Sequence, residues 1–457
     1  MGKEKITIGE SGIYDAKQLG NSKIIILGLQ HMFAMFGATV LVPALTGLSV
    51  STTLLFAGLG TLLFHLLAKG KVPAFLGSSF AYLAGYWVIA PNKEPELLPY
   101  ACFGVACSAL LYLILAGLIK AFGAKKVMRY FPPIVTGPII IAIGLTLSSS
   151  AINNCKSSWF VAIVAIVVVI VCNIWGKGMI KIVPIIMGVI ASYIVAALMG
   201  QVDFSGVAKA AWVGLPIQYD RTVFAIFKAP DVSLLITAVI TIMPIALATM
   251  VEHIGDISAI SSTVGKNYIE DPGLHRTLCG DGLATLIASL FGGPANTTYG
   301  ENTGVLSLTR VFDPLVIRVA AYFAILFSFS PKFEALIASM PTATVGGVSL
   351  VLYGMISAVG VRNVVENHVD FSKNRNVIIA ALILVLSIGI KFTTVYNTAG
   401  EEVMASGINL TFGSLTISLS GLAVGAVVGI LMNAVLPGKD YEFGKGAPGD
   451  TAVNFEV

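Results

Sequence analysis

The segment TTYGENTGVLSLTR, residues 297–310, decides how this chain folds. It places a carboxylate and an amide, Glu301 and Asn302, in a sequence that is 56% hydrophobic and only 11% charged. A charged side chain at the centre of a bilayer costs about 2.5–3.5 kcal/mol on insertion scales. Polar groups at such a depth therefore require a physical reason.

The rest of the chain has the composition of a polytopic membrane protein. A mean hydropathy of +0.88 excludes a soluble enzyme with one or two ordinary cores. Apolar stretches of about 18–25 residues, long enough for a helix to cross a bilayer, recur between short polar or Gly/Pro-containing breaks. We expect fourteen spans, near residues 23–44, 51–68, 73–90, 100–121, 132–150, 158–175, 180–199, 233–260, 277–292, 296–311, 313–330, 340–359, 375–392 and 417–436.

The loops between these spans indicate how the chain is oriented. An even number of spans places both termini on one side, and most of the 28 Lys and Arg residues fall on that side, which is typical of the cytoplasm. The start of the chain is too charged for a secretory signal. We therefore predict a multi-pass protein of the plasma (cytoplasmic, or cell inner) membrane. Its parts would be a cytoplasmic segment 1–21, a first seven-span repeat 22–200, an extracellular loop 201–231, a second repeat 232–437 and a cytoplasmic tail 438–457.

Two sets of seven spans would form an inverted repeat, because an odd number of crossings reverses the orientation of the second set. The third spans of the two sets support this prediction. The sequence GSSFA at 77–81 aligns with NTTYG at 296–300, and each follows a Pro-Ala pair. These small hydroxylated residues favour a short extended stretch followed by a half-helix. Two half-helices that start near the midplane would direct unpaired N–H groups into a shared polar site.

Acidic side chains are concentrated near the same predicted site. Glu252 and Asp256 in span 8 are four residues apart and so share one helical face. Asp281 lies in span 9, and Glu301 follows the break in span 10. We expect Glu252 and Glu301 to face a ligand, because each sits at a predicted helix interruption and the spans offer no Lys or Arg to neutralise them. For Asp281 a purely structural network is an equal alternative.

The polar neighbours of these acids have structural explanations. His253 points away from Glu252 on a helix and is expected to pack or to contact another helix. His31 in span 1 is interpreted in the same way. Asn302 is expected to hydrogen-bond the interrupted backbone, because a backbone freed from helical bonding must find partners inside a membrane.

Several blocks of this sequence resemble the nucleobase-ascorbate transporter family, also called nucleobase:cation symporters. The segment Glu301-Asn302-Thr303-Gly304, followed by Thr309-Arg310, resembles the signature of the family. Further similar blocks are QHMFAMFGATVLVP at 30–43, GKVPAFLGSSFAY at 70–82, VEHIGD at 251–256, DPGLHR at 271–276 and GGVSLVLYG at 346–354. They occur in order over most of the chain, and they are most similar to the bacterial uracil-carrying branch.

The resemblance implies an all-α core-and-gate fold with fourteen transmembrane segments. Spans 1–4 and 8–11 would form the core, the other spans the gate, and a homodimer is expected. The substrate would lie between the half-helices of spans 3 and 10. The residues implied to hold it are Phe80, Glu252, Tyr299, Gly300, Glu301 and Tyr353, with Ala38 lining the pocket.

The chemistry of uracil fits these side chains. Uracil is a flat ring with two N–H donors and two carbonyl acceptors. Carboxylates at Glu252 and Glu301 can accept from the donors through charge-assisted hydrogen bonds. Backbone N–H groups near Phe80 and Gly300 can donate to the carbonyls, and Phe80 or Tyr299 can pack against the ring. Uracil is therefore the expected substrate.

One position departs from the uracil-carrying pattern. Where that pattern has a histidine commonly tied to proton coupling, this chain has Asp256. Purine carriers of the family resemble the chain at Asp256 and at Asp281, although they usually have Gln at position 301. A xanthine or purine permease therefore remains an alternative. We expect proton symport by alternating access, with Glu301, Asp256 or Glu252 as the proton-carrying group, and sodium as the less favoured coupling ion.

Other functional classes fit the sequence less well. An anion carrier of the same fold remains an alternative, but paired acids oppose an anion. A channel would need a continuous polar path, whereas the acids cluster at one depth. The loops show no Cys/His metal spacing, phosphate loop or nucleophile elbow. No enzymatic activity, cofactor, metal or nucleic-acid partner is therefore expected.

Overall fold

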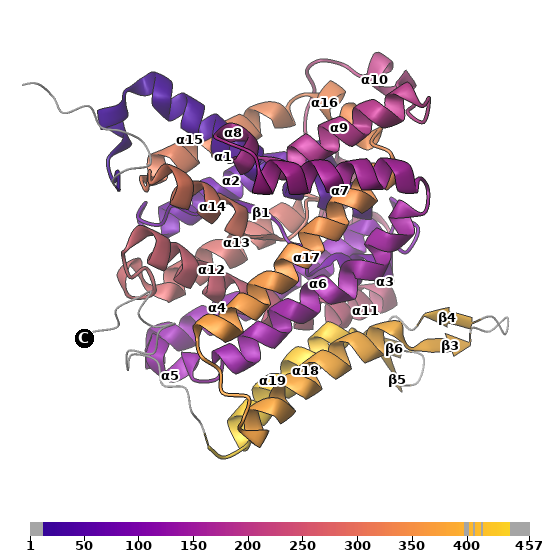
Figure 1. Ribbon diagram of the computed structural model, residues 1–457. Coiled ribbons are helices and arrows are strands. Elements are labelled where there is room, and N and C mark those ends of the chain that lie inside the picture. Colours follow the sequence, from indigo (N-terminus) through magenta and orange to yellow (C-terminus); the bar gives the residue numbers. More distant parts are fainter. Residues whose placement is uncertain (1–11, 397–401, 405–406, 413–414, 439–457) are drawn as a thin grey trace, which may run out of the picture.

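The computed structural model describes residues 12–396, 402–404, 407–412 and 415–438 of a helical membrane protein (Figure 1). The helices of the first half are α1 (Asn21–Thr46), α2 (Val50–Leu67), α3 (Leu83–Ile89), α4 (Leu98–Phe122), α5 (Ala124–Met128), α6 (Pro133–Cys155), α7 (Trp159–Ile174), α8 (Met179–Ile182), α9 (Pro184–Leu198) and α10 (Ser205–Lys209). Those of the second half are α11 (Val232–Ile242), α12 (Ala246–Val264), α13 (Leu274–Leu290), α14 (Gly300–Thr309), α15 (Pro314–Ser328), α16 (Pro331–Ala338), α17 (Thr342–Glu366), α18 (Asn374–Phe392) and α19 (Gly421–Val435).

Short elements complete the described chain. The strands are β1 (Leu76–Ser78), β2 (Asn296–Thr298), β3 (Thr394–Tyr396), β4 (Glu402–Met404), β5 (Ile408–Phe412) and β6 (Leu415–Leu419). The short turns are η1 (Ala16–Leu19), η2 (Tyr219–Arg221), η3 (Val223–Lys228), η4 (Met243–Ile245) and η5 (Ile269–Gly273). Of the predicted cytoplasmic tail 438–457, all but residue 438 lies outside the described residues.

The predicted spans coincide with these elements. Each span matches a helix, the pair α11–α12, or a strand followed by a helix. By length and hydropathy, seven helices of the described chain can cross a membrane, or eight if α15 and α16, bent by 87° at their junction, count as one. The helices α7, α9 and α19 are apolar but shorter. The polytopic helical class is therefore confirmed, and the number fourteen stays a prediction.

Short strands that the sequence did not predict lie between α18 and α19. There β3 pairs with β4 and β5 pairs with β6, both antiparallel. The last span was expected to begin at residue 417, yet its helix begins at Gly421. The segment LTISL at 415–419 alternates apolar and polar residues, a period of two that favours a strand. Its apolar content had been attributed to the helix that follows.

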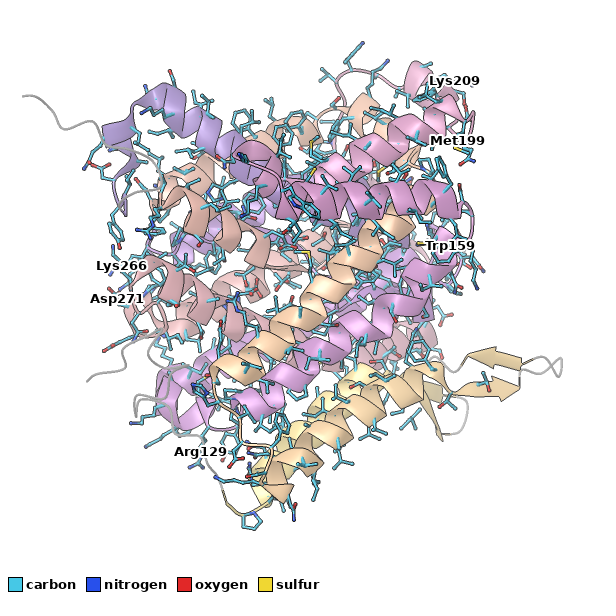
Figure 2. All side chains as sticks on the ribbon, viewed as in Figure 1. Arg129, Trp159, Met199, Lys209, Lys266 and Asp271 are labelled. Carbon is cyan, nitrogen blue, oxygen red and sulfur yellow. The ribbon has the colours of Figure 1, made fainter. Side chains whose placement is uncertain are left out.

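Residues from loops predicted to lie on opposite sides of the membrane are labelled far apart in Figure 2. Lys266, Asp271 and Arg129, from loops predicted to be cytoplasmic, lie at the left and lower left, and Lys209, from the loop predicted to be external, lies at the right. The orientation of the chain in the membrane stays a prediction. The predicted external loop 201–231 is structured by α10, η2 and η3, and Gly214 donates its N–H to the carbonyl of Phe329 (2.9 Å).

The helices pack as two groups that match the expected core and gate. In the core, α4 packs on α13, and α2 packs on both α13 and α15. In the gate, α6 and α17 lie side by side along their length, with α7 and α9 on one flank and α18 and α19 on the other (Figure 1). The groups meet mainly where α12 contacts α6 and α19, and where α1 contacts α9 and α17.

The third span of each half is broken, as predicted. In the first half β1 precedes α3, and in the second half β2 precedes α14. The two strands pair antiparallel, with Gly77 opposite Thr297. The N–H of Ser79 donates to the carbonyl of Ala295 (2.9 Å), and the N–H of Tyr299 donates to that of Phe75 (3.0 Å). These two hydrogen bonds are related by a local two-fold axis at the Gly77–Thr297 pair, as an inverted repeat requires.

A threonine from each half supports the strand of the same half. Thr61 on α2 accepts a hydrogen bond from the N–H of Leu76 (2.9 Å). Thr285 on α13 does the same for the N–H of Asn296 (3.1 Å). Each hydroxyl pairs a backbone group that would otherwise be unsatisfied inside the membrane. The sequence comparison did not identify this pair.

The pairing also corrects the predicted alignment of the two repeats by one residue. The sequence comparison made Gly77 the equivalent of Asn296. The two-fold axis at the Gly77–Thr297 pair instead makes Gly77 equivalent to Thr297, and Leu76 equivalent to Asn296. On this register Phe80 corresponds to Gly300. The prediction relied on small hydroxylated residues, which cannot distinguish neighbouring registers because both repeats contain them in succession.

Candidate binding site

Glu252 lies within an unbroken helix, which corrects one expectation. Helix α12 is continuous from Ala246, and the interruption of span 8 is the turn η4, which contains Pro244. Proline removes a backbone donor, so the break falls there and not at the acid. The carboxylate is partly exposed, and its Oε2 is buried without a hydrogen-bond partner among the described residues.

Glu301 lies in the first turn of α14, directly after β2. The N-terminus of a helix carries a partial positive charge, which stabilises a nearby carboxylate. Gly300, the first residue of α14, is exposed. A Cβ at Gly300 would meet only Oδ1 of Asp256, at 3.9 Å. The start of α14 therefore faces the acidic side of α12 across open space.

Tyr299 bridges the two broken spans. Its hydroxyl donates to the carbonyl of Ser78 (2.8 Å). Its ring covers Gly77, where a Cβ would lie 2.4 Å from the Tyr299 Cζ. Only glycine at position 77 permits this contact. The tyrosine side chain is thus engaged by the opposite strand, so Phe80 is the better placed of the two rings to pack against a ligand.

Phe80 and Tyr353 bring the core and the gate together. Phe80 follows β1 in the core, and Tyr353 lies on α17 in the gate. Their rings are T-shaped, with centroids 5.8 Å apart and an interplanar angle of 73°. The Tyr353 hydroxyl is buried and has no partner among the described residues. Ala38 is fully buried on α1, beside Thr39, whose carbonyl accepts a hydrogen bond from the Ser78 hydroxyl (2.7 Å).

His31 and Asn302 form a contact between α1 and α14. The Asn302 amide donates to the carbonyl of His31 (3.1 Å) and lies 3.2 Å from its Nδ1. Both residues are fully buried. The structure therefore brings these two predicted network residues together. The expected partner of Asn302 was wrong, because its amide bonds the backbone of α1 and not the interrupted backbone of its own span.

A second polar chain runs behind the acids. The Thr298 hydroxyl donates to Oδ2 of Asp256 (2.9 Å) and lies 3.4 Å from Nδ1 of His253. The same Nδ1 is 3.5 Å from Oδ2 of Asp281. His253 does contact another helix, as expected, but its partner is an acid. Thr298 was overlooked, because nothing in the sequence places its hydroxyl beside a residue forty-two positions away.

The acids lie close enough to influence one another. Glu252 interacts electrostatically with Asp256, Asp281 and Glu301. The ion pairs in the described chain leave Glu252, Asp256 and Glu301 without a cationic partner. Among the described residues, no group of three or more His, Cys, Asp and Glu side chains is arranged to hold a metal ion. The arrangement suits a neutral ligand that donates hydrogen bonds.

Solved structures share this fold. The transmembrane domain of a cyanobacterium bicarbonate transporter, BicA, aligns with a TM-score of 0.56 at 15% identity, over 83% of this chain and 97% of that one. SLC26A9 aligns with a TM-score of 0.60 at 13% identity, over 92% of this chain and 66% of that one. At such low identity the similarity establishes the fold alone.

Curated relatives are much more similar in sequence. The uracil permease of Bacillus caldolyticus is 41% identical over 425 residues, which cover 91% of this chain and 92% of the relative. The uracil permease of Escherichia coli (strain K12) is 36% identical over 423 residues, 90% of each chain. Residues 22–396 match the family described as the Permease family. The chain therefore belongs to this permease family, the nucleobase-ascorbate transporters that its motifs resemble, and is a multi-pass membrane transporter and not an enzyme.

Proposed function

We propose that this permease imports uracil by proton symport through alternating access. The observation that carries the proposal is the half-helix α14, which starts beside unpaired acids at the junction of the two broken spans. The start of α14 carries Glu301, and Glu252 has a buried carboxylate oxygen without a partner. The names of the curated relatives support uracil as the substrate.

Uracil complements the groups at the junction. Its two ring N–H groups can donate to Glu252 and Glu301, and hydrogen bonds to charged groups contribute about 1.5–3 kcal/mol each. Its carbonyls can accept from the backbone N–H groups at the start of α14. Phe80, whose edge-to-face contact with Tyr353 closes the core against the gate, offers an aromatic face to the ring. This arrangement supports a flat neutral ligand with alternating donors and acceptors.

Proton coupling follows from the density of acids. Several carboxylates within range of one another's charges favour binding a proton over remaining ionised, and a neutral site crosses the membrane interior at lower cost. Asp256, Glu252 and Glu301 are the candidate proton carriers. We propose that both termini face the cytoplasm and that the plasma membrane is the location. A homodimer remains a prediction from the family resemblance.

Two other substrate classes, purines and anions, are the alternatives to uracil. A xanthine or purine substrate is favoured by Asp256 and Asp281. An anion is favoured only by the shared fold of the solved structures, and it would be repelled by acids that lack a cationic partner. Competition of radiolabelled uracil uptake by pyrimidines, purines and bicarbonate ranks these classes directly. Strong competition by xanthine and none by thymine or other pyrimidines would reassign the substrate.

The central experiment is uracil uptake into proteoliposomes under separate proton and sodium gradients. We expect an inward proton gradient to drive accumulation and a sodium gradient to have no effect. The Glu301→Ala variant should lose uracil binding, whereas the Lys209→Ala variant, altered on the exposed helix α10, should retain it. Uptake that follows sodium and ignores protons would overturn the coupling, and unchanged affinity in Glu301→Ala would overturn the site.

A further inference from the structure

A continuous chain of polar side chains leads from the acidic site into the core. We name it the buried relay, and its members in order are Asp256, Thr298, His253 and Asp281. The successive heavy-atom distances are 2.9, 3.4 and 3.5 Å. Asp256 lies on α12, is partly exposed and faces the start of α14, whereas His253 and Asp281 are fully buried. The relay therefore has one end at the binding site and the other in the interior.

The protons of the relay cannot be rearranged independently. Its last link, between Nδ1 of His253 and Oδ2 of Asp281, is a 3.5 Å polar contact, and the Asp281 carboxylate makes no hydrogen bond among the described residues. The Thr298 hydroxyl has one proton, so it can donate to Asp256 or to His253 but not to both. Nδ1 of His253 faces both Thr298 and Asp281, so that nitrogen either donates a proton or accepts one. The Phe64 ring holds the imidazole from the side, with centroids 6.2 Å apart at 73°. A change at Asp256 must therefore alter what His253 presents to Asp281.

We propose that when Asp256 takes up a proton, His253 passes its Nδ1 proton to Asp281, so that all three side chains become neutral together. This proposal rests on the proposed proton coupling. His253 and Asp281 are then positioning residues, which act through Asp256.

Two states of the relay satisfy this geometry. With Asp256 ionised, Thr298 donates to it, and an imidazolium at His253 donates from Nδ1 toward ionised Asp281. When a proton from water binds Asp256, this acid donates to Thr298, and the Thr298 hydroxyl turns to Nδ1. The Nδ1 proton then moves to Oδ2 of Asp281. One proton has entered, and the charges on Asp256, His253 and Asp281 have all been neutralised.

The energetic reason is the cost of charge in an apolar interior. Buried charges are tolerated only when they are paired, and an ionised Asp256 is what stabilises the imidazolium between two carboxylates. Once Asp256 is neutral, the remaining pair is more stable as two neutral groups. Nε2 of His253 has no hydrogen-bond partner among the described residues and carries its proton in both states, so it favours neither.

Other titratable groups surround the relay, and Tyr112 interacts electrostatically with Asp281. Those on elements packed against α12 or on α12 itself are Glu252, Glu301 on α14, Tyr100, Cys102, Cys107, Tyr112 and Lys120 on α4, Cys155 on α6, His275, Arg276 and Cys279 on α13, and Glu270 and Asp271 in η5. Tyr112 donates to Thr249, one turn before His253 (2.6 Å). Among the residues that the structure describes, Asp281 is the ionisable group that contacts the His253 ring, so it is the acceptor that the geometry selects.

The test is infrared difference spectroscopy of the full-length transporter in proteoliposomes, between alkaline and acidic buffer. We expect wild type to gain separate protonated-carboxyl bands from Asp256 and Asp281 with a common midpoint. Asp256→Asn should remove both bands from the difference spectrum, because a neutral amide imitates the protonated acid and Asp281 would then be protonated in both buffers. Asp281→Asn should remove only the second band.

Variants of Thr298 show whether its hydroxyl couples the protonation of Asp256 to that of Asp281 or only supports the fold. Thr298→Val removes the hydroxyl and should uncouple the Asp281 band from the Asp256 midpoint, whereas Thr298→Ser should restore the common midpoint. Thr263→Val, whose hydroxyl bonds only Ala259 in its own helix (2.9 Å), is the matched control on α12 and should leave both bands unchanged.

The outcomes distinguish this inference from the proposed function. An Asp281 band with the same midpoint in wild type, Asp256→Asn and Thr298→Val would overturn the relay, even if uracil still drives proton uptake. Absence of uracil-driven proton uptake in wild type would overturn the proposed coupling, whatever the bands show.

Discussion

The two broken spans share a backbone design and differ in chemistry. In both, a strand beside the two-fold axis is supported by a threonine from the preceding helix, Thr61 or Thr285. After the strand the two differ. The second half begins α14 at once, with an acid in its first turn, whereas the first half begins α3 only at Leu83, after Phe80.

This difference shows how an inverted repeat makes an asymmetric site. Symmetry places two chain interruptions opposite each other, which creates a polar junction in an apolar interior. In the proposed site, departures from this symmetry would decide what binds, because the first half supplies Phe80 and the second half supplies Glu301. The acids of α12 and α13 add to the same side. The two halves share the same backbone arrangement. They differ in their side chains, as at the corresponding positions Phe80 and Gly300.

The largest expected effect comes from removing the charge of the second half. Glu301→Leu keeps most of the volume of the side chain and removes the charge-assisted hydrogen bond that Glu301 is proposed to accept from uracil. We expect uracil affinity to fall by about 1.5–3 kcal/mol, or roughly 10- to 150-fold. Phe80→Leu in the first half should cost less, about 0.5–1.5 kcal/mol. Equilibrium binding of radiolabelled uracil to the purified variants measures both, and equal losses would show that the halves do not differ in role.

The contact between the halves should be nearly as sensitive. At Gly77→Ala the new Cβ would lie 2.4 Å from the Tyr299 ring and 2.7 Å from the Thr39 hydroxyl. Overpacking of this kind costs about 1–3 kcal/mol, so we expect a lower melting temperature in detergent and weaker uracil binding. Gly117→Ala on α4, where no atom lies within 4 Å, is the control. Equal melting temperatures for the two variants would contradict the bridging role of Tyr299.

Substitution of Thr61 and of Thr285 tests whether the two halves, which share a backbone arrangement, also gain equal stability from their threonine hydrogen bonds. Thr61→Val and Thr285→Val each leave a buried strand N–H without its partner, at an expected cost of about 1–3 kcal/mol. Thermal unfolding of the single and double variants should give similar losses for the two singles. A loss in only one variant would mean that one strand is held by other contacts.

The smallest effect is expected at the phenol of Tyr299. Tyr299→Phe keeps the ring over Gly77 and removes the hydrogen bond to the Ser78 carbonyl, which contributes about 0.5–1.5 kcal/mol. We expect a small drop in melting temperature and uracil affinity within a few-fold of wild type. If Tyr299→Phe abolished binding, the hydroxyl would be contacting the substrate, and Tyr299 would belong with Glu301 and not with the framework.

Much of the architecture could be predicted from local pattern. Span length, hydropathy and the short motifs after Pro73 and Pro294 are properties of neighbouring residues, and they identified the polytopic class, the repeat and both interruptions. The strands at 394–419 were missed because a short alternating segment beside a longer apolar one was assigned to the helix. The register of the two repeats was one residue out because adjacent hydroxylated residues are interchangeable to a sequence comparison.

Local pattern could also say which side chains were out of place in a membrane, and it selected Glu252, Asp256, Asp281 and Glu301 on that basis. It could not say which atoms those acids face. Whether His253 packs or pairs with Asp281, whether Thr298 bonds Asp256, and whether Tyr299 is free or bound to Ser78 depend on contacts between segments about thirty to more than two hundred residues apart. Hydrophobic periodicity acts along one helix, whereas hydrogen bonding between helices exists only after they pack, so these pairings belong to the tertiary structure alone.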